Sequence, residues 1–302
     1  LVIHSGGDSK RVPQYSAVGK LFSPVPRKLP DGRGSTLFDE FIIGMSGVPS
    51  RFREGMLVLS GDVLLLFNPL QIDAQFDGAA AISIKEPVET GKNHGIFLND
   101  GQGYVKHFLH KQSEENLRTI GAVNDHGTVD LDTGAILLNS ALLNSLYGLI
   151  STDGKTDVSK FDMFVNDKVR ISFYGDFLYP LATASTLEDY YLEKPEGEDS
   201  PALRRCRKEI WDVLSPYSMK LLRLSPAKFI HFGTTKELRN LLTEELSEYA
   251  FLDWENQVLS TNTNNQTYAS YGSYIGRRAI IGDGAYLEQS YVLDESSIGN
   301  GS

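Results

Sequence analysis

The stretch that decides the fold is the N-terminal one, Leu1-Val-Ile-His-Ser-Gly-Gly-Asp-Ser-Lys-Arg-Val-Pro13. Its apolar start predicts a short buried strand, which Gly6-Gly7 ends abruptly. Glycines let the backbone approach an anion and point successive N–H groups at it. The following loop, which continues to Gly19-Lys20, adds three basic side chains, those of Lys10, Arg11 and Lys20. This pattern predicts a phosphate cradle; the alternative is an ordinary glycine turn after a strand.

Charge is distributed unevenly along the chain. Of its 302 residues, 29 are lysine or arginine and 39 are aspartate or glutamate, a net charge of −10. Such a protein has no general attraction for nucleic acid or an anionic membrane, so neither is expected as a partner. Between Ser9 and Arg33, however, a single acid, Asp31, accompanies six basic residues: Lys10, Arg11, Lys20, Arg27, Lys28 and Arg33. A local positive patch in an acidic chain predicts a small polyanion as ligand.

The bulk composition, with 41% hydrophobic and 23% charged residues, is that of an ordinary soluble globular protein. No apolar run approaches the length of a membrane span, and the N-terminus lacks the features of a signal peptide. A single cysteine, Cys206, excludes an intramolecular disulfide, so a reducing, cytoplasmic location is expected. The chain opens inside a predicted strand and stops within a repeating pattern, so both ends are expected to be cuts.

Apolar runs and helical patterns alternate after the N-terminal loop. Ser35 is a candidate N-cap for a helix that reaches about Gly44. Met56 to Ser60 predicts a buried parallel strand that delivers Asp62 at its carboxyl end, where open parallel sheets bind ligands. Further strands are expected over residues 79–85, 95–98, 104–110, 129–139, 169–174 and 228–232, and further helices over residues 140–150, 200–214 and 234–246. This alternation predicts an α/β sheet.

The end of the chain has a different pattern. After a polar linker, Ile-Gly-x-x-Ala occurs at Ile275 and again at Ile281, and Leu287 continues the six-residue spacing. Such spacing is typical of a left-handed parallel β-helix, and the alternative is a chance alternation in an ordinary sheet. We therefore expect one domain over residues 1–255 and the start of a β-helix over residues 266–302. So few turns need support from the main domain or from further turns.

Carboxylates at strand ends are the candidate metal ligands. Asp62 could hold Mg²⁺ against a triphosphate, because that ion prefers one or two carboxylates plus phosphate oxygens; a structural turn is the alternative. Asp132 and Asp176 are further strand-linked acids. Two other phosphate-binding motifs fail: the spacing before Gly154-Lys155-Thr156 does not fit a Walker loop, and no Gly-x-Gly-x-x-Gly follows a strand.

Gly6-Gly7-x-Ser9-x-Arg11-x-Pro13 followed by Gly19-Lys20 resembles the signature of sugar-1-phosphate nucleotidyltransferases. Within that group the chain resembles the fucose-1-phosphate guanylyltransferase family, also called GDP-fucose pyrophosphorylases, whose members occur alone or ahead of an L-fucokinase domain. Six motifs in order carry this likeness: His4-Ser-Gly-Gly-Asp-Ser-Lys-Arg-Val-Pro13, Ser60-Gly-Asp-Val63, His94-Gly-Ile-Phe97, Leu131-Asp-Thr-Gly134, Tyr174-Gly-Asp-Phe-Leu178 and His231-Phe-Gly-Thr234.

The resemblance implies a Rossmann-like nucleotidyltransferase domain with a mixed, mostly parallel sheet. It also implies a Mg²⁺-dependent attack by L-fucose-1-phosphate on the α-phosphorus of GTP, which gives GDP-L-fucose and pyrophosphate. In such a transfer the protein holds two anions together, aligns the attacking and leaving oxygens, and neutralises developing charge. The implied partners are GTP and L-fucose-1-phosphate, with an L-fucokinase domain, fused or associated, as a further candidate.

The resemblance also implies roles for particular residues. The triphosphate would be bound by Gly6, Gly7, Ser9, Arg11 and Lys20, of which Arg11 and Lys20 are the catalytic candidates. Arg11 would stabilise the departing pyrophosphate, and Lys20 would bridge phosphates near the reacting phosphorus. Asp62 would hold the metal. The sugar phosphate would be bound by Lys111, Asp132, Thr133 and Gly134.

One position departs from the broader superfamily. The segment that begins at His231 usually starts with aspartate, the second metal ligand, and imidazole is a poor ligand for Mg²⁺. Asp176 is therefore the hypothesis for the second ligand, with a structural turn carboxylate as the competing role. Three other functions stay open: a transferase for another base or sugar, a catalytically silent sugar-nucleotide sensor, and a hexapeptide acyltransferase.

Overall fold

The computed structural model describes residues 1–5, 9–110, 112–263 and 267–302. These residues form two compact units whose segments alternate along the sequence. Unit 1 consists of Leu1–Ile3, Gly47–Ser60 and Leu66–Lys228, and unit 2 of His4–Ser46, Gly61–Leu65 and Phe229–Ser302. This division does not coincide with the boundary expected after residue 255, which stays a prediction. None of the described helices is long and apolar enough to cross a membrane.

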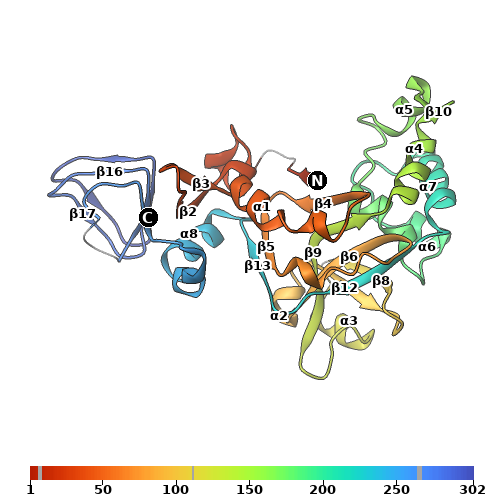
Figure 1. The fold of residues 1–302 in the computed structure, drawn as a ribbon, viewed down its shortest axis with the longest axis horizontal. Helices are drawn as coiled ribbons and strands as arrows, with labels where there is room; N and C mark the ends of the chain where they lie inside the picture. Colours follow the sequence, from red (N-terminus) through yellow and green to blue (C-terminus); the bar gives the residue numbers. More distant parts are fainter. Residues whose placement is uncertain (6–8, 111, 264–266) are drawn as a thin grey trace. The chain divides into compact units, whose positions relative to one another are not determined.

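Unit 1 is built on a seven-stranded sheet with the order β1-β4-β9-β6-β12, to which β7 and β8 are joined through β9 (Figure 1). β12 is parallel to β6, whereas β9 is antiparallel to β4, β6 and β7. The predicted mixed sheet of an α/β protein is thus confirmed. The strands are β1 Val2–His4, β4 Met56–Ser60, β6 Gly78–Pro87, β7 Gly95–Asn99, β8 Val105–His110, β9 Thr128–Leu138 and β12 Ser218–Arg223.

Strand β9 changes its neighbour partway along its length. Its carboxyl-terminal part pairs with β4, where Val58 faces Ile136, and its amino-terminal part pairs with β7, where Ile96 faces Leu131. On its other side the register with β6 slips between the pairs Ile82–Ala135 and Ser83–Asp132. Thr133 and Gly134 are therefore extra residues in a bulge. A bulge at such a change of neighbour re-aims side chains and opens the sheet.

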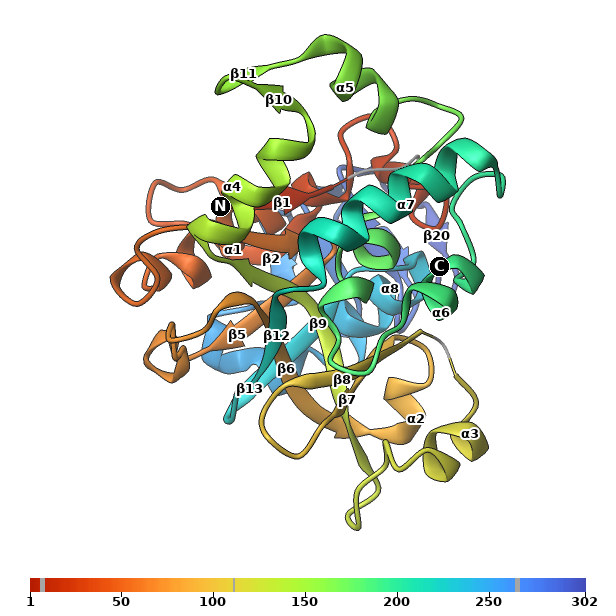
Figure 2. The ribbon, with the colours of Figure 1, turned by 90° about the vertical axis from the view of Figure 1, so that its right-hand side faces the viewer.

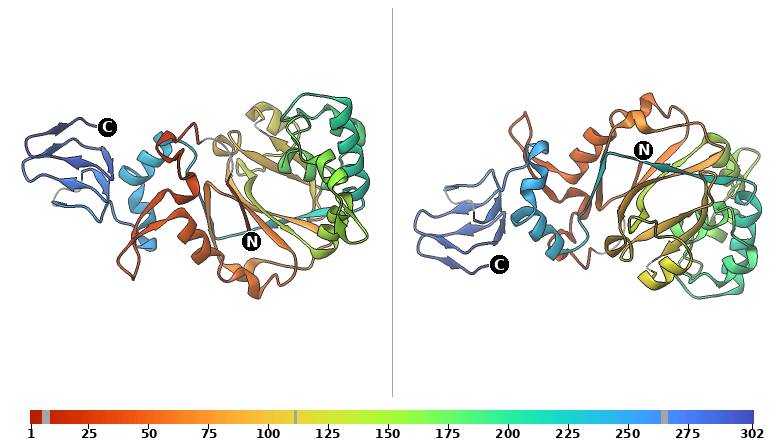
Figure 3. Two further views of the ribbon diagram at one scale, coloured as in Figure 1. Left: turned by 90° about the horizontal axis from the view of Figure 1, so that it is seen from above. Right: turned by 90° about the horizontal axis from the view of Figure 1, so that it is seen from below.

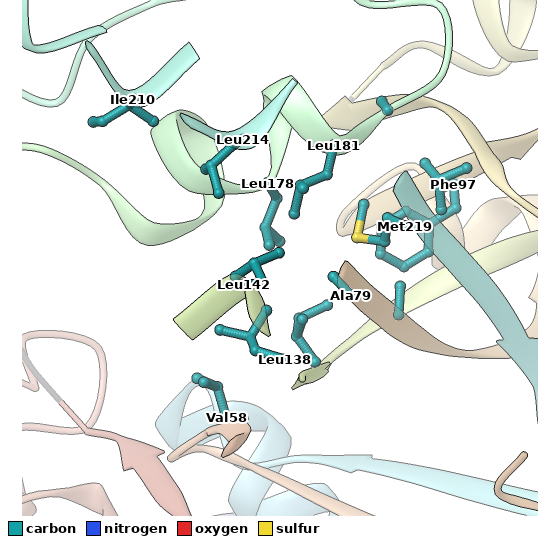
Figure 4. Packing of buried hydrophobic residues seen from close by; sticks show 14 of the residues in the cluster. Val58, Ala79, Phe97, Leu138, Leu142, Leu178, Leu181, Ile210, Leu214 and Met219 are labelled. Carbon is teal, nitrogen blue, oxygen red and sulfur yellow. The ribbon is translucent and has the colours of Figure 1, made fainter. Parts of the chain in front are cut away.

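Helices on one face of this sheet enclose the main core of unit 1. Figure 2 shows α4 and α7 lying across the strands, and Figure 4 shows the apolar side chains between them. Leu142 of α4 and Leu214 of α7 pack with Met219 of β12, and all three are at most 1% exposed. The helices of unit 1 are α2 Val88–Gly91, α3 Glu114–Thr119, α4 Ser140–Leu149, α5 Val158–Phe164, α6 Leu187–Leu192 and α7 Pro201–Leu214.

A smaller cluster covers another part of the sheet. Leu117 of α3 packs with Val88 of α2 and with Ile96 and Val129 of the sheet, and each of these side chains is buried. A short hairpin, β10 Ser151–Thr152 and β11 Lys155–Thr156, connects α4 to α5. The remaining turns of unit 1 are the 3₁₀ segments Val48–Ser50, Pro69–Gln71 and Tyr179–Leu181.

The strand expected over residues 169–174 is absent from the described chain and is a wrong prediction. A π-helical turn, Phe173–Phe177, occupies the end of this segment. The Asp176 carboxylate accepts the N–H of Ser172 at 2.7 Å, and the Ser172 hydroxyl accepts the N–H of Gly175 at 3.3 Å. These local side-chain bonds replace the pairing that a strand would have needed.

Unit 2 contains the hairpin β2 Pro24–Lys28 and β3 Gly34–Thr36, followed by helix α1 Leu37–Met45. Thr36, not the expected Ser35, is the N-cap, because it and Asp39 form a reciprocal capping box. The Ser35 hydroxyl instead donates to buried Glu40. β5 Val63–Phe67 pairs with β13 Ala227–His231, and residues 63–65 and 229–231 of these strands belong to unit 2. The unit also contains helix α8 Thr235–Thr243 and the 3₁₀ segments Pro13–Tyr15, Lys20–Phe22 and Leu246–Leu252.

In the C-terminal part of unit 2 the chain winds through successive turns of short parallel strands, drawn in blue in Figure 3. We call this part, from β14 to β20, the C-terminal coil. From β15 onward, each paired residue lies seventeen positions after its partner: Ala269 pairs with Tyr286, Tyr274 with Tyr291, and Ile280 with Ser297. Gln257 of β14 pairs with Ser270, thirteen positions later. The interior contains buried Ile275, Ala285, Leu287 and Val292. The strands are β14 Gln257–Val258, β15 Ala269–Tyr271, β16 Tyr274–Ile275, β17 Ile280–Ile281, β18 Tyr286–Glu288, β19 Tyr291–Val292 and β20 Ser297–Ile298.

Candidate functional site

Unit 2 gathers Lys20, Asp62 and the segment that begins at His231. The Lys20 ammonium donates to Oδ2 of Asp62 at 3.1 Å and to the carbonyl oxygen of Gly233 at 3.0 Å. Nε2 of His231 lies 3.9 Å from the same Asp62 oxygen. The Lys20 and Asp62 side chains are 13% and 21% exposed, so this ion pair is shielded and still reached by solvent. The lysine and the carboxylate predicted to act on a phosphate and a metal therefore lie in contact.

Two strands bring these groups together. Asp62 lies directly before β5 and His231 ends β13, and these strands pair with each other (Figure 1). The N–H of Phe232 donates to the Asp62 carbonyl oxygen at 2.8 Å. Gly233 is needed at its position because a Cβ there would lie 1.9 Å from Cε1 of His231. The sequence thus folds the His231 ring back over a residue that has no side chain.

The basic loop is attached to the start of α8. The carbonyl oxygen of Arg11 accepts the N–H of Thr235 at 3.0 Å and its hydroxyl at 3.2 Å. The Arg11 side chain is exposed, as a group that meets an anion from solution must be. Ser9 adopts a left-handed backbone conformation with φ of 49°, and its carbonyl oxygen accepts the N–H of Val12. Gly6 and Gly7 lie outside the described residues, so the predicted backbone cradle has no structural description.

In unit 1, three of the four residues predicted to bind the sugar phosphate lie at the bulge of β9: Asp132 beside it, and Thr133 and Gly134 within it. Gly134 has φ of +70°, and a Cβ there would lie 2.7 Å from Cβ of Ser60. The Tyr174 hydroxyl donates to the Gly134 carbonyl oxygen at 3.3 Å. The Thr133 hydroxyl donates to the Ile82 carbonyl oxygen at 2.7 Å and is buried. The Thr133 side chain thus fixes the bulge, and any contact with a ligand there falls to Asp132 and to backbone groups.

Asp132 differs electrostatically from an ordinary surface carboxylate. Desolvation raises the pKa of Asp132 to about 6, although the N–H of Gly134 donates to its Oδ1 at 2.9 Å and acts in the opposite direction. A Cβ at Gly95 would lie 3.0 Å from the Asp132 carboxylate and 2.8 Å from the Phe108 ring, so only glycine fits between these two side chains. The carboxylate oxygens of Asp132 are hydrogen-bond acceptors, so this residue can bind sugar hydroxyls.

Asp176 lies in a different setting from Asp62. Its Oδ1 accepts Nε of Arg207 at 2.8 Å, its Oδ2 accepts the N–H of Ser172, and the two charged side chains are only 3% and 2% exposed. Arg207 also donates to the carbonyl oxygens of Tyr190 and Glu193. A metal ion there would have to displace a buried arginine, so the geometry favours the structural role for Asp176. Lys111 lies outside the described residues.

Sequence reasoning missed two partners of the bulge, Ser60 and Tyr174. Ser60, the last residue of β4, lies close to Gly134 at the point where β9 changes its neighbouring strand. Tyr174, in the π-helical turn, donates a hydrogen bond to the same glycine. Both residues belong to motifs that carry the family resemblance, Ser60-Gly-Asp-Val63 and Tyr174-Gly-Asp-Phe-Leu178. Their places in those motifs were the available signal.

The fit of the residues to Mg²⁺ can be judged from the donor set. Among the described residues, no three histidine, cysteine, aspartate or glutamate side chains are grouped as a ready-made metal site. Asp62, whose side chain is 21% exposed and accepts a hydrogen bond from Lys20, fits an ion that takes its other ligands from phosphate oxygens and water. Asp62 thus fits a metal that arrives with a nucleotide.

The sequence model of the fucose pyrophosphorylase domain family matches residues 1–302 of this chain. The chain belongs to this family. It is 25% identical over 328 aligned residues to human fucose-1-phosphate guanylyltransferase, covering 99% of this chain and 53% of that protein. It is 26% identical to the bifunctional fucokinase/GDP-fucose pyrophosphorylase of Arabidopsis thaliana, covering 82% of this chain and 23% of that protein. The L-fucokinase/L-fucose-1-P guanylyltransferase of Bacteroides fragilis is 23% identical, with 79% and 22% covered.

The extent of these matches differs between the two kinds of relative. The aligned part of this chain spans about half the length of the human guanylyltransferase and under a quarter of each bifunctional protein. The predicted resemblance to the fucose-1-phosphate guanylyltransferase family is thereby confirmed.

Proposed function

We propose that the chain carries out guanylyl transfer from GTP to L-fucose-1-phosphate, with Mg²⁺ and with release of pyrophosphate. The observation that carries this proposal is the contact of Lys20 with Asp62 beside His231 and Gly233, in a chain that belongs to the fucose pyrophosphorylase family. A lysine and a partly exposed carboxylate in contact suit a magnesium-bound polyphosphate, because the lysine binds phosphate oxygens and the carboxylate binds the metal. The names of the relatives supply the sugar phosphate and the guanylyl group.

The unit 2 residues are assigned to the triphosphate. Asp62 holds the metal, which would neutralise charge on the phosphates when bound. Lys20 binds phosphate oxygens near the reacting phosphorus, and exposed Arg11 stabilises the negative charge that builds up on the leaving pyrophosphate. Gly6, Gly7 and Ser9 line the triphosphate in this proposal. The sugar 1-phosphate oxygen forms the new bond to the α-phosphorus as the bond to pyrophosphate breaks.

The unit 1 residues are assigned to the sugar phosphate. Asp132 accepts hydrogen bonds from sugar hydroxyls, the backbone of Thr133 and Gly134 completes the contact, and Lys111 binds the phosphate. Asp176 is assigned to the support of the surrounding fold through Arg207 and not to the metal. The C-terminal coil is proposed to be the start of a left-handed parallel β-helix, supported by its parallel strands in a seventeen-residue register.

The names of two relatives support a further partner. Both bifunctional proteins include a fucokinase, and such a kinase makes the sugar 1-phosphate that the proposed transfer consumes. We therefore keep an L-fucokinase domain, fused or associated, in the proposal, together with a cytoplasmic location.

The deciding experiment measures pyrophosphate release with Mg²⁺, GTP and L-fucose-1-phosphate, with ATP, UTP and mannose-1-phosphate in parallel. Release is expected with GTP and fucose-1-phosphate, and Lys20→Met should reduce it strongly. Lys28→Met is the matched control, because Lys28 is an exposed lysine of the same basic segment. Release with a different pair would assign another base or sugar. Binding of GTP without release from any pair would indicate a sensor and contradict the proposal.

A further inference from the structure

Glu288, on strand β18 of the C-terminal coil, contacts the basic loop of the same unit. The Tyr15 hydroxyl donates to Oε2 of Glu288 at 2.5 Å. The Tyr286 hydroxyl donates to the same oxygen at 3.1 Å. Tyr15 ends the 3₁₀ segment Pro13–Tyr15 and is only 3% exposed. Two phenols, one from the loop and one from the coil, thus converge on one carboxylate that is 273 residues away from Tyr15 in the chain.

The electrostatics of this cluster keep both phenols as donors. Burial raises the pKa of Tyr15 and of Tyr286 above the ordinary tyrosine value, and the nearby Glu288 carboxylate acts in the same direction. Burial also raises the pKa of Glu288, while the two donated hydrogen bonds oppose that rise. Hydrogen bonds to a carboxylate that is partly removed from water are stronger than bonds between neutral groups. The contact is therefore more than a surface hydrogen bond.

The backbone continues this contact directly to Lys20. The carbonyl oxygen of Tyr15 accepts the N–H of Gly19 at 2.7 Å. Gly19 has φ of +81°, a conformation that glycine adopts without strain, and turns the chain into the 3₁₀ segment Lys20–Phe22. Lys20 then donates to Asp62 and to the carbonyl oxygen of Gly233. A displacement of the Tyr15 ring would therefore be passed to the lysine within one turn of chain.

The other end of the loop has its own anchor. Thr235, at the start of α8, donates two hydrogen bonds to the Arg11 carbonyl oxygen. The segment between Arg11 and Lys20 is thus held by α8 on one side and by β18 of the coil on the other. The two attachments fix the loop before any ligand arrives, and such preorganisation lowers the cost of binding an anion.

We propose that Glu288 is a positioning residue, which sets the geometry of the phosphate-binding loop through Tyr15. This inference rests on the proposed function, in which Lys20 contacts the triphosphate, and it adds that the C-terminal coil takes part in nucleotide binding. Misplacement of a reacting or binding group by about 1 Å can cost on the order of 10²-fold in rate, so a hydrogen bond remote from the ligand can matter.

The first test compares two phenol deletions on the same carboxylate. Tyr15→Phe should raise the KM for GTP about tenfold and leave the KM for fucose-1-phosphate unchanged, because the loss of a strong hydrogen bond frees the loop. Tyr286→Phe is the comparison variant: it removes the other phenol from Glu288 and that phenol's contact with Tyr15, but it leaves the bond between Tyr15 and Glu288 in place. It should therefore raise the KM for GTP much less than Tyr15→Phe does. Equal effects of the two variants on GTP would contradict the positioning role.

A second test uses Glu288 itself. Glu288→Gln keeps an oxygen acceptor for Tyr15 and should recover most of the GTP affinity that Glu288→Ala loses. Combining Glu288→Ala with Tyr15→Phe should be no worse for GTP than the more damaging single variant, because both remove one interaction. Effects that multiply in the double variant would show that the two residues act separately and would overturn the inference.

A third measurement separates this inference from the proposed function. Hydrogen exchange of the ligand-free protein should show faster exchange at Gly19 and its neighbours in Glu288→Ala than in the wild type, with the coil unchanged. Faster exchange in a protein that transfers nothing would support the contact and refute the proposed reaction. Normal transfer with unaltered exchange and unaltered KM in Glu288→Ala would refute the positioning role alone.

Discussion

Gly61-Asp62 and Gly175-Asp176 both follow apolar segments, but their carboxylates lie in different environments. Gly61-Asp62 leads into β5, and its carboxylate contacts Lys20 at a site that solvent reaches. Gly175-Asp176 lies in a π-helical turn, and its carboxylate is enclosed with Arg207. Each aspartate contacts a cation at about 3 Å, so the difference lies in how far each carboxylate is removed from solvent.

This difference separates a binding carboxylate from a structural one. The two carboxylate oxygens of Asp176 accept hydrogen bonds from Arg207 and from the N–H of Ser172. The Asp176 and Arg207 side chains are both buried. A buried pair of this kind is costly to form and costly to break from one side. Asp62 is 21% exposed, which leaves it able to exchange a neighbour for a ligand. Burial, more than the presence of a cation, marks the structural aspartate.

The largest expected effect is on stability, from Asp176. Asp176→Asn should lower the free energy of unfolding by about 3–5 kcal/mol, because it leaves the Arg207 guanidinium buried without its counter-charge. Chemical denaturation monitored by tryptophan fluorescence measures this. The paired replacement Asp176→Leu with Arg207→Met should recover part of the loss. A change of less than about 1 kcal/mol in Asp176→Asn would remove the structural assignment and revive the metal hypothesis.

The second effect is on activity, from Asp62. Asp62→Asn should slow pyrophosphate release by about 10²-fold or more and change the free energy of unfolding by less than about 1 kcal/mol, as for other solvent-accessible ion pairs. Initial rates at saturating substrates, with denaturation of the same preparation, test both halves. If Asp62→Asn unfolded as readily as Asp176→Asn, the contrast between the two carboxylates would collapse.

The sequence anticipated the sheet better than the turns. The apolar runs from Met56 to Ser60 and over residues 129–139 predicted β4 and β9, because a buried strand needs an uninterrupted run and little else. Strand β5 was missed although Val63–Phe67 is as apolar as β4, since only two residues separate the two strands. The strand predicted at 169–174 does not form, because the side chains of Ser172 and Asp176 accept hydrogen bonds from the local backbone.

The sequence predicted which residue types make up the candidate site, but it did not predict the surroundings of each residue. Glycines and basic side chains in the first twenty residues indicated an anion, and the described part of the loop does place Lys20 against Asp62. No pattern in the sequence could show that Asp176 would meet Arg207, thirty-one positions later, in the interior. The bulge at Thr133 and Gly134 was equally hidden, because it results from a change in strand neighbour and not from a local preference.

A third prediction concerns the bulge. Gly134→Ala should destabilise unit 1 by about 1–3 kcal/mol, and more than Gly127→Ala does, because only the first adds a close approach to Ser60. Gly127 is the matched control: its φ of +73° is close to the +70° of Gly134, and its Cβ would meet nothing within 4 Å. The KM for fucose-1-phosphate should rise in Gly134→Ala alone. Equal thermal shifts in the two variants would mean that the bulge tolerates a side chain.

The smallest expected effect comes from Asp132. Desolvation acts on its carboxylate, as burial does on Asp176, but no arginine offsets that cost at Asp132. A folded-state pKa of about 6 exceeds the ordinary value of 3.8, so the folded protein binds more protons at this site between those two pH values. This group's contribution to stability therefore falls as the pH rises from about 4 to 6, and above that range the charged carboxylate is a net cost.

Asp132→Asn removes that cost. The variant should be more stable than the wild type by about 1 kcal/mol at pH 7.5, less than the full shift would give, because Asp132 is partly exposed. The advantage should vanish as the pH falls to about 4, and it should be accompanied by weaker binding of fucose-1-phosphate. Unfolding free energies of both proteins across this range measure the effect. An advantage that grew toward acid pH would have the wrong sign and would place Asp132 with the stabilising carboxylates, beside Asp176.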